Sequence, residues 1–121
     1  MNYQCQQTII NGFDLEICGG THHFSLTTQD QLNLMNLNVM AQTENMIPYH
    51  ADGEEVIFYT AEEIKEIVSA ANAFKIYQTT YFNALKSYIQ VLETIEEIAA
   101  ITYGTEIPEE YKSSVLKTLE L

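Results

Sequence analysis

The chain has 121 residues, of which 46% are hydrophobic, so it is long enough for one domain, spanning 1–121, with a buried core. Seventeen acidic residues stand against five lysines and no arginine, and the formal net charge is −12. This charge opposes direct binding to nucleic acid or to an anionic membrane. The chain has neither a long apolar run nor a secretory signal at its start, so we expect a cytoplasmic protein without a membrane span.

The first predicted element is a β-hairpin formed by residues 2–10 and 13–18. Asn-Gly between alternating runs, here Asn11-Gly12, is a strong signal for a two-residue turn. In that register Cys5 lies opposite Cys18, where side chains approach closely, so a disulfide between them is geometrically feasible. A reducing cytoplasm favours two free thiols instead.

Residues 21–26 are predicted to continue the hairpin as a short strand, and a helix is predicted over 28–42. Thr28 and Gln31 have the spacing of a capping box, in which each side chain satisfies a backbone N–H of the first turn. A second hairpin follows over 47–59, with Asp-Gly at its turn. We assign the core-facing side of the helix to four apolar residues, Leu32, Met35, Val39 and Met40.

One helical pattern without proline occupies residues 60–104. Thr60 and Glu63 form a second capping box at its start, and Gly104 is placed to end it. Apolar residues recur at intervals of three and four, the pattern of a coiled coil, with one polar exception at Gln78. We call the following positions the helix stripe: Ile64, Ile67, Ala71, Phe74, Gln78, Tyr81, Leu85, Tyr88, Leu92 and Ile95.

The length of this pattern leaves two alternatives open. A straight helix over 60–104 would extend about 65 Å, whereas a compact domain of this size is only about 35 Å across. The helix therefore either pairs its stripe with identical helices or breaks at Gln78–Thr80 and folds back. We prefer the continuous helix, which predicts a homo-oligomer held by residues 64–99, with a trimer slightly preferred over a dimer.

A short helix is predicted at the C-terminus, over about 108–120 of the segment 105–121. Pro108 and the two acids that follow it suit a first helical turn. The complete prediction is an α+β fold with three parts. Residues 1–59 hold hairpins and a short helix, residues 60–104 form the long helix, and residues 105–121 form the C-terminal helix.

No residue pattern supports a catalytic site, a metal site or a bound cofactor. His22 and His23 are adjacent in a predicted strand, so they point to opposite faces and do not bind one ion together. His50, Asp52 and Glu54 surround a predicted turn and lack the spacing of helical or paired-cysteine ligands. We therefore predict a non-enzymatic protein.

Four tyrosines lie in or beside the helix stripe, namely Tyr77, Tyr81, Tyr88 and Tyr103. A tyrosine hydroxyl at a core-like position needs a hydrogen-bond partner, and such tyrosines are frequent at protein interfaces. The pattern fits an interface between chains and a helix contact within one chain about equally well.

Four stretches resemble an uncharacterised family of small phage and prophage proteins: FSLTTQDQLNLMNL, YHADGEEVIFYTAEEI, YFNALKSYI and YGTEIPEEY. Members of that family are often met beside tail genes or as the C-terminal part of tail-fibre-associated proteins. The resemblance covers residues 22–116 and leaves residues 1–21 largely outside it. It implies a virion or tail-assembly role, in the host bacterial cytoplasm or in the virion itself, and it carries over no catalytic residues.

The leading prediction is therefore a non-enzymatic tail or tail-fibre-associated protein that contacts other phage tail proteins and copies of itself. The alternative is a small acidic phage protein that mimics nucleic acid and inhibits a host defence nucleoprotein, because clustered carboxylates imitate a row of phosphates. Gene neighbours separate these two hypotheses. Tail genes on both sides favour the first, and a regulatory or defence-related neighbour favours the second.

Overall fold

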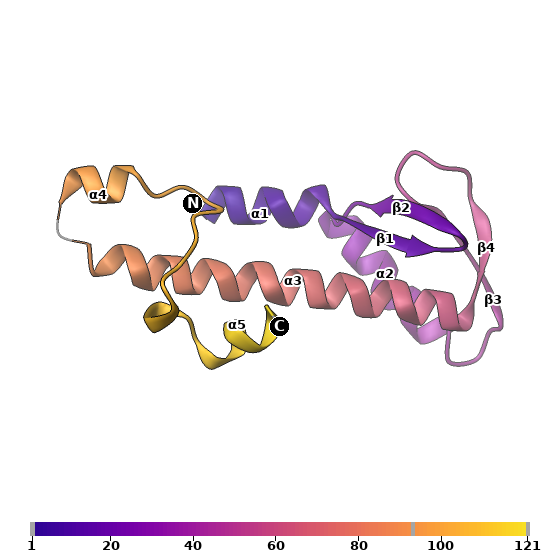
Figure 1. The fold of residues 1–121 in the computed structure, drawn as a ribbon. Coiled ribbons are helices and arrows are strands. Elements are labelled where there is room, and N and C mark those ends of the chain that lie inside the picture. Colours follow the sequence, from indigo (N-terminus) through magenta and orange to yellow (C-terminus); the bar gives the residue numbers. More distant parts are fainter. Residues whose placement is uncertain (1, 93, 121) are drawn as a thin grey trace. The chain divides into compact units, whose positions relative to one another are not determined.

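The computed structural model describes residues 2–92 and 94–120, apart from the side chains of Ile95 and Glu96. These residues form an α+β fold with two antiparallel hairpins, a dominant long helix and a short C-terminal helix, as predicted (Figure 1). The elements in chain order are α1 (Asn2–Asn11), β1 (Phe13–Ile17), β2 (Gly20–Phe24), α2 (Thr28–Met40), β3 (Met46–Tyr49), β4 (Ile57–Thr60), α3 (Ala61–Gln90), α4 (Ile95–Ala99), η1 (Glu109–Tyr111) and α5 (Ser114–Leu119).

The chain divides into two compact units. The α/β unit comprises Thr8–Phe74 and holds both hairpins, α2 and the first part of α3. The helical unit comprises the residues up to Gln7 together with those from Lys75 onward. Each unit has its own cluster of buried apolar side chains. The assignment of the whole chain to a single domain remains a prediction.

The N-terminus is the largest correction to the sequence prediction. Residues 2–11 form helix α1 and not the first strand of a hairpin. Gly12 follows the helix with a φ of 87°, and its N–H donates to the carbonyl of Ile9 at 3.0 Å. A positive φ suits a helix C-cap as well as a hairpin turn. The Asn-Gly signal was therefore correct about the positive φ of Gly12 and wrong about the element, because Asn11 is helical.

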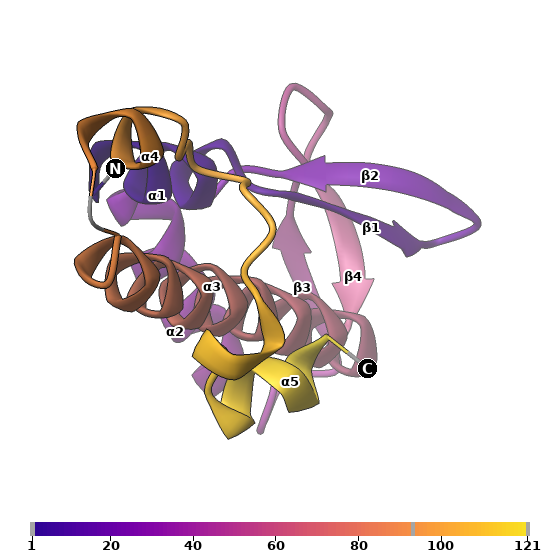
Figure 2. The ribbon, with the colours of Figure 1, turned by 60° about the vertical axis from the view of Figure 1, so that its left-hand side comes forward.

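The first hairpin pairs β1 with β2, from Phe13 opposite Phe24 to Ile17 opposite Gly20 (Figure 2). Its turn is Cys18-Gly19, and both residues have positive φ, 56° and 82°. Two positive φ values are the requirement of a type I′ turn, which matches the twist of the flanking strands. The predicted strand at 21–26 is thus confirmed, with residues 13–17 as its partner.

Helix α2 is confirmed, with a capping box one residue earlier than predicted. The Thr27 hydroxyl accepts from the N–H of Asp30, and the Asp30 carboxylate accepts from the N–H of Thr27, both at 3.1 Å. Aspartate serves here in the position that glutamate or glutamine usually fills. The face of the helix that packs on the core is also different from the predicted one, and consists of Leu34, Leu37 and the adjoining Ala41.

The second hairpin pairs β3 with β4, from Met46 opposite Thr60 to Tyr49 opposite Ile57 (Figure 2). A loop over 50–56 connects the strands, which is longer than the tight connection that the sequence suggests. The Asp-Gly turn does form inside this loop, because the N–H of Glu54 donates to the carbonyl of Ala51 at 3.1 Å. Strand pairing begins only after the loop, at Ile57.

Helix α3 begins with the predicted capping box and continues through Gln78–Thr80 without a break. The Thr60 N–H donates to the Glu63 carboxylate at 2.8 Å, and the Glu63 N–H donates to the Thr60 hydroxyl at 3.1 Å. The helix ends at Gln90, well before the predicted end at Gly104. Its last turn tightens into i to i+3 hydrogen bonds, from Val91 to Tyr88 and from Leu92 to Ile89.

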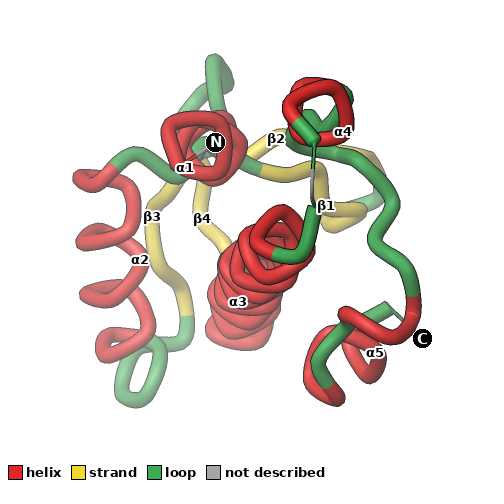
Figure 3. Tube along the Cα trace, turned by 90° about the vertical axis from the view of Figure 1, so that its left-hand side faces the viewer, coloured by secondary structure: helices red, strands yellow, loops and turns green. Residues whose placement is uncertain are grey.

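The chain after α3 is mostly loop with short helical segments (Figure 3). The predicted C-terminal helix is present but divided, with Pro108 preceding η1 and the hydroxyl of Ser113 capping α5. Ile107 and Leu116 from this segment are buried against Leu85 of α3. These contacts give a physical reason for the early end of α3. The chain that returns after Gln90 covers the apolar face of the helix, and a longer helix would leave that face without cover.

Candidate functional site

The first half of the helix stripe is buried within the α/β unit. Ile64, Ile67 and Ala71 belong to its core, and Phe74 packs against that core. Ile64 and Ile67 have no exposed surface. These side chains contact their own chain and are therefore not available to a second one.

The second half of the stripe lies in the helical unit. Tyr81 and Leu85 are buried there, Tyr88 packs against them, and Gln78 and Leu92 are half-buried. The side chain of Ile95 lies outside the described residues. In the residues described, the stripe is therefore covered by its own chain, whereas the sequence prediction assigned this cover to identical helices. Self-association itself remains a prediction.

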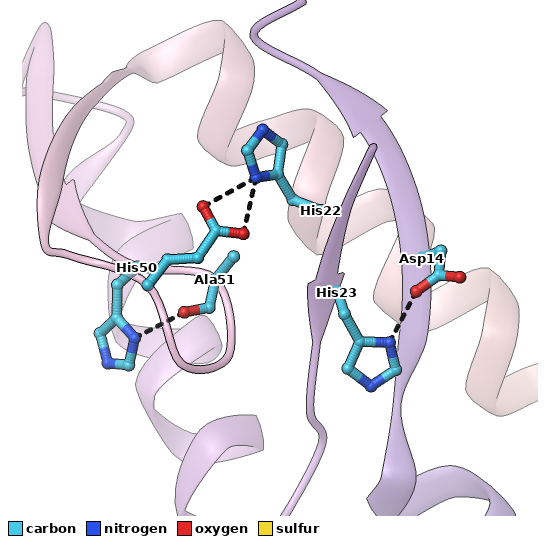
Figure 4. A network of polar contacts seen from close by, with 6 residues as sticks. Asp14, His22, His23, His50 and Ala51 are labelled. Atoms are coloured by element: carbon cyan, nitrogen blue, oxygen red, sulfur yellow. Dashed lines mark hydrogen bonds and ion pairs between the residues drawn. The ribbon is translucent and has the colours of Figure 1, made fainter. Parts of the chain in front are cut away.

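Three histidines surround the first hairpin and the 50–56 loop (Figure 4). His22 and His23 point to opposite sides of β2, as predicted from their adjacency. His22 Nδ1 lies 2.8 and 2.9 Å from the two carboxylate oxygens of Glu54, and His50 Nδ1 donates to the carbonyl of Ala51 at 2.8 Å. Within the described residues, no three His, Cys, Asp or Glu side chains are grouped as metal ligands.

His23 contacts an acceptor at each ring nitrogen. Nδ1 lies 2.7 Å from Asp14 on β1, and Nε2 lies 2.5 Å from the carbonyl of Asn11 at the end of α1. A neutral imidazole has only one N–H, so the imidazolium alone donates to both acceptors. The hydrogen bond to Asp14 and the one to Asn11 accordingly raise the pKa of His23. The two hydrogen bonds of His23 hold the end of α1 against the first hairpin, which is a structural role.

The two cysteines are free thiols, and the hairpin that would have placed Cys5 opposite Cys18 does not form. Cys18 is exposed at the tip of the first hairpin, and its thiol donates to the Glu63 carboxylate at 2.9 Å. This hydrogen bond, followed by burial and the negative charges of Glu63 and Glu66, raises the pKa of Cys18 to about 11. The thiol stays protonated near neutral pH, which opposes a nucleophilic role.

Buried Cys5 belongs to a polar network in the helical unit. Its thiol donates to the carbonyl of Gln78 at 3.6 Å, and the hydroxyl of Tyr103 donates to the Gln78 side-chain oxygen at 2.5 Å. The hydroxyl of Tyr81 donates to the carbonyl of Thr105 and accepts from the N–H of Gly104 at 3.1 Å. The predicted tyrosine contacts are thus formed within one chain, where they fasten the returning segment to α3.

Two exposed apolar surfaces lie on the α/β unit. The first, here called the α2 row, is formed by Leu32, Met35 and Val39, whose exposed fractions are 50%, 65% and 65%. The sequence identified this face as apolar and assigned it to the core. Because the opposite face is also apolar, with Leu34 and Leu37, the sequence alone does not distinguish the inner side from the outer side.

The second surface, here called the hairpin surface, is the outer face of β3–β4 and the residue leading into it. Ile47 and Tyr59 form the buried side of this hairpin. Side chains two residues apart on a strand share a face. The sequence missed this surface because Val-Ile-Phe-Tyr reads as a wholly buried strand. The exposed residues that make up the hairpin surface are Met46, Pro48, Val56 and Phe58.

Negative charge is concentrated in the same unit. The α/β unit holds ten acidic residues against Lys65 alone, a net charge of −9, and eight of those acids are exposed. The helical unit holds seven acids and four lysines, a net charge of −3. The two apolar surfaces therefore lie on the more strongly charged part of the molecule.

Comparisons with known proteins give a family but no activity. Within the described residues, no helix is both long and apolar enough to cross a bilayer. Neither a curated protein nor a solved structure matches the chain. A family model described as a domain of unknown function, DUF4376, matches residues 1–103, a range that includes the N-terminal residues 1–21. Because this match spans most of the chain, the protein belongs to the DUF4376 family.

Proposed function

We propose that this protein is a non-enzymatic, phage or prophage tail-associated protein that acts through protein–protein contacts. The hairpin surface is the observation that carries the proposal. Pro48 and Phe58 are directly opposite each other, and Met46 is two residues from Pro48 on the same face. Val56, which is exposed, leads into β4 two residues before Phe58. Phe58 is 65% exposed. Exposed apolar residues that adjoin one another are typical of binding surfaces, whereas single ones are common on any protein.

The charges beside this surface indicate the chemistry of its partner. Glu55 directly precedes Val56 and is exposed, and Glu54 before it is also exposed, although its carboxylate is paired with His22. The partner we propose is a tail protein with an apolar pocket for Phe58 and lysine or arginine residues at its rim. Opposite charges at the edge of such an interface accelerate association and suppress wrong partners, while a buried aromatic side chain supplies most of the affinity.

The tail setting rests on the sequence resemblance. One of the four resembling stretches, YHADGEEVIFYTAEEI, includes Val56, Phe58 and the two glutamates before them. Part of the proposed surface therefore lies in a stretch on which the resemblance to phage and prophage proteins rests.

A second candidate function is favoured by the charge distribution. Eight exposed acids on the α/β unit provide the negative surface that a nucleic-acid mimic requires. Such a protein would compete with DNA or RNA for a basic groove on a host defence nucleoprotein. Its binding would weaken steeply with added salt and would survive the loss of Phe58.

The proposal is tested by co-expressing the tagged protein with the tail genes of the phage or prophage that encodes it, followed by affinity purification. Wild-type protein should retain a tail-gene product, and Phe58→Ala should reduce that retention at least about tenfold, as expected for an interface anchor. Val115→Ala is the matched control, because Val115 is an apolar side chain of α5, in the helical unit, that is 54% exposed. Retention that survives Phe58→Ala would contradict the proposal.

A further inference from the structure

Helix α2 has two apolar faces, and only one of them contacts the core. Leu34 and Leu37 are buried, whereas the three residues of the α2 row lie on the opposite side and are at least half exposed. At about 100° per residue, the row occupies an arc of only about 60°. Figure 3 shows α2 at the edge of the α/β unit with β3 beside it.

Helix α2 itself carries almost no charge, although the α/β unit as a whole is strongly negative. The only charged residue of α2 is Asp30, and its carboxylate accepts hydrogen bonds from the hydroxyls of Ser25 and Thr27 at 2.8 Å. The other exposed polar residues of the helix are uncharged, namely Thr28, Gln29, Asn36 and Asn38. A basic partner thus finds no free carboxylate on this helix. An identical helix can approach it without bringing like charges together, although the whole chain carries −12.

We infer that the α2 row is the contact surface for a second copy of this chain. The two α2 helices pack antiparallel about a two-fold axis close to Met35, so that Leu32 of one copy meets Val39 of the other. Intervals of three and four residues suit helix–helix packing, and a two-fold arrangement uses the same surface on both copies. Met35 beside its counterpart at the axis adapts well to such a contact, because its side chain is unbranched.

This inference rests on the proposed function, in which the protein acts through protein–protein contacts. It names a second copy of the chain as one partner and leaves the hairpin surface free for the tail protein. A helix of 13 residues buries much less than the area of a standard complex. The dimer is therefore weak, with a dissociation constant on the order of 100 μM.

Disulfide trapping tests the arrangement directly. In a Cys18→Ser background, Met35→Cys should give a covalent dimer on mild oxidation, because residues at the axis come within disulfide distance. Leu32→Cys mixed with Val39→Cys should cross-link with each other in preference to either variant alone. Ile76→Cys is the control, since Ile76 is 53% exposed on α3 within the helical unit. Trapping of Leu32→Cys with itself, or of Ile76→Cys as efficiently as Met35→Cys, overturns the inference.

The mass of the protein in solution gives an independent measurement. Light scattering should show wild-type mass rising from one chain towards two between about 10 μM and 1 mM, as a weak dimer requires. Met35→Asp should remain at one chain with an unchanged circular dichroism melt, and Ile76→Asp should behave as wild type. A wild type that stays at one chain yet captures its tail partner overturns this inference alone. A wild type that dimerises yet captures no tail protein contradicts the proposed function alone.

Discussion

The two units of this molecule use successive parts of one helix in chemically different ways. In the α/β unit, the first part of α3 contributes aliphatic side chains such as Ile64 and Ile67 to a core completed by both hairpins. In the helical unit, the later part contributes Tyr81 and Leu85 to a smaller core rich in tyrosine. The comparison shows that one heptad-like pattern supports two kinds of packing. Regular spacing indicates a buried face without indicating what covers it.

The units also differ in what they leave exposed. The α/β unit has adjoining apolar side chains on α2 and on the outer face of β3–β4, together with a net charge of −9. The large exposed apolar residues of the helical unit are spread over several elements, for example Tyr3 on α1, Ile76 on α3 and Val115 on α5. Both proposed contact surfaces therefore lie on the α/β unit, and the helical unit covers the second part of α3.

The largest effect is expected from a charge placed in the core of the helical unit. Leu85→Asp buries a carboxylate at a position with no exposed surface and should cost more than about 4 kcal/mol, enough to unfold a marginally stable unit. Chemical denaturation followed by tyrosine fluorescence measures this loss. Ser87→Asp is the control, because Ser87 is exposed on the same helix. Two variants of equal stability would show that Leu85 is not buried as described.

A somewhat smaller effect is expected where the α/β unit is most tightly packed. A Cβ at Gly12 would lie 1.9 Å from the carbonyl oxygen of Phe24, and the φ of 87° is itself unfavourable for alanine. Gly12→Ala should therefore destabilise the protein by about 3–5 kcal/mol. Gly104 in the helical unit also has a positive φ, 111°, but a Cβ there would meet nothing within 4 Å. Gly104→Ala should cost only about 1–2 kcal/mol when both variants are measured by the same chemical denaturation.

An intermediate effect tests whether hydroxyl groups hold the helical unit together. Tyr81→Phe removes the hydrogen bonds to Thr105 and Gly104 and leaves both backbone groups without that partner. The expected loss is about 1–3 kcal/mol in the free energy of unfolding. Tyr3→Phe should change stability very little, because Tyr3 is 69% exposed. A Tyr81→Phe variant as stable as wild type would mean that packing alone fixes the returning segment.

The smallest effect concerns the pH dependence that His23 gives to the α/β unit. The pKa of His23 is raised in the folded state by Asp14 and then by Asn11, so the folded protein holds this proton more tightly than the unfolded chain does. The associated stability is fully present below the pKa of the unfolded state and is lost as pH rises through the folded pKa. Because the side chain is 42% exposed, the contribution should be below about 1 kcal/mol.

Melting temperatures measured from about pH 5 to pH 9 test this contribution, since the unperturbed pKa of histidine lies near 6.5. His23→Gln and Asp14→Asn should both flatten the decline that wild type shows with rising pH. An equally steep decline in both variants would assign the pH dependence to other groups.

Much of the fold follows from local signals in the sequence. The capping box at Thr60 and Glu63 locates the start of α3, and Asp52-Gly53 followed by a run of apolar residues locates the second hairpin. Helix α1 could not be predicted in this way, because its boundary depends on distant contacts. The carbonyl of Ile10 accepts from the N–H of Leu26, and Gly12 lies against Phe24. Both partners are beyond the reach of a local pattern.

The end of α3 and the candidate surfaces were unpredictable for a related reason. No glycine or proline lies between Gln90 and Gly104 to mark the end of the helix, and Ile107 and Leu116 of the returning chain pack against Leu85. The strand containing Phe58 resembles a buried strand in composition, and only the two-stranded sheet reveals that one face has no cover within the described part of the unit. Tertiary contacts decide these features, and sequence spacing does not record them.

The central claim, that the hairpin surface is where the protein binds its partner, is tested most directly by site-specific photocross-linking. A photoreactive phenylalanine analogue would replace Phe58, or Val115 as the control, in bacteria that produce the phage. Adducts would be identified by mass spectrometry. Our account predicts an adduct between residue 58 and a tail-gene product of the same phage, and none at residue 115. Tail-protein adducts at residue 115 with none at residue 58 would contradict it.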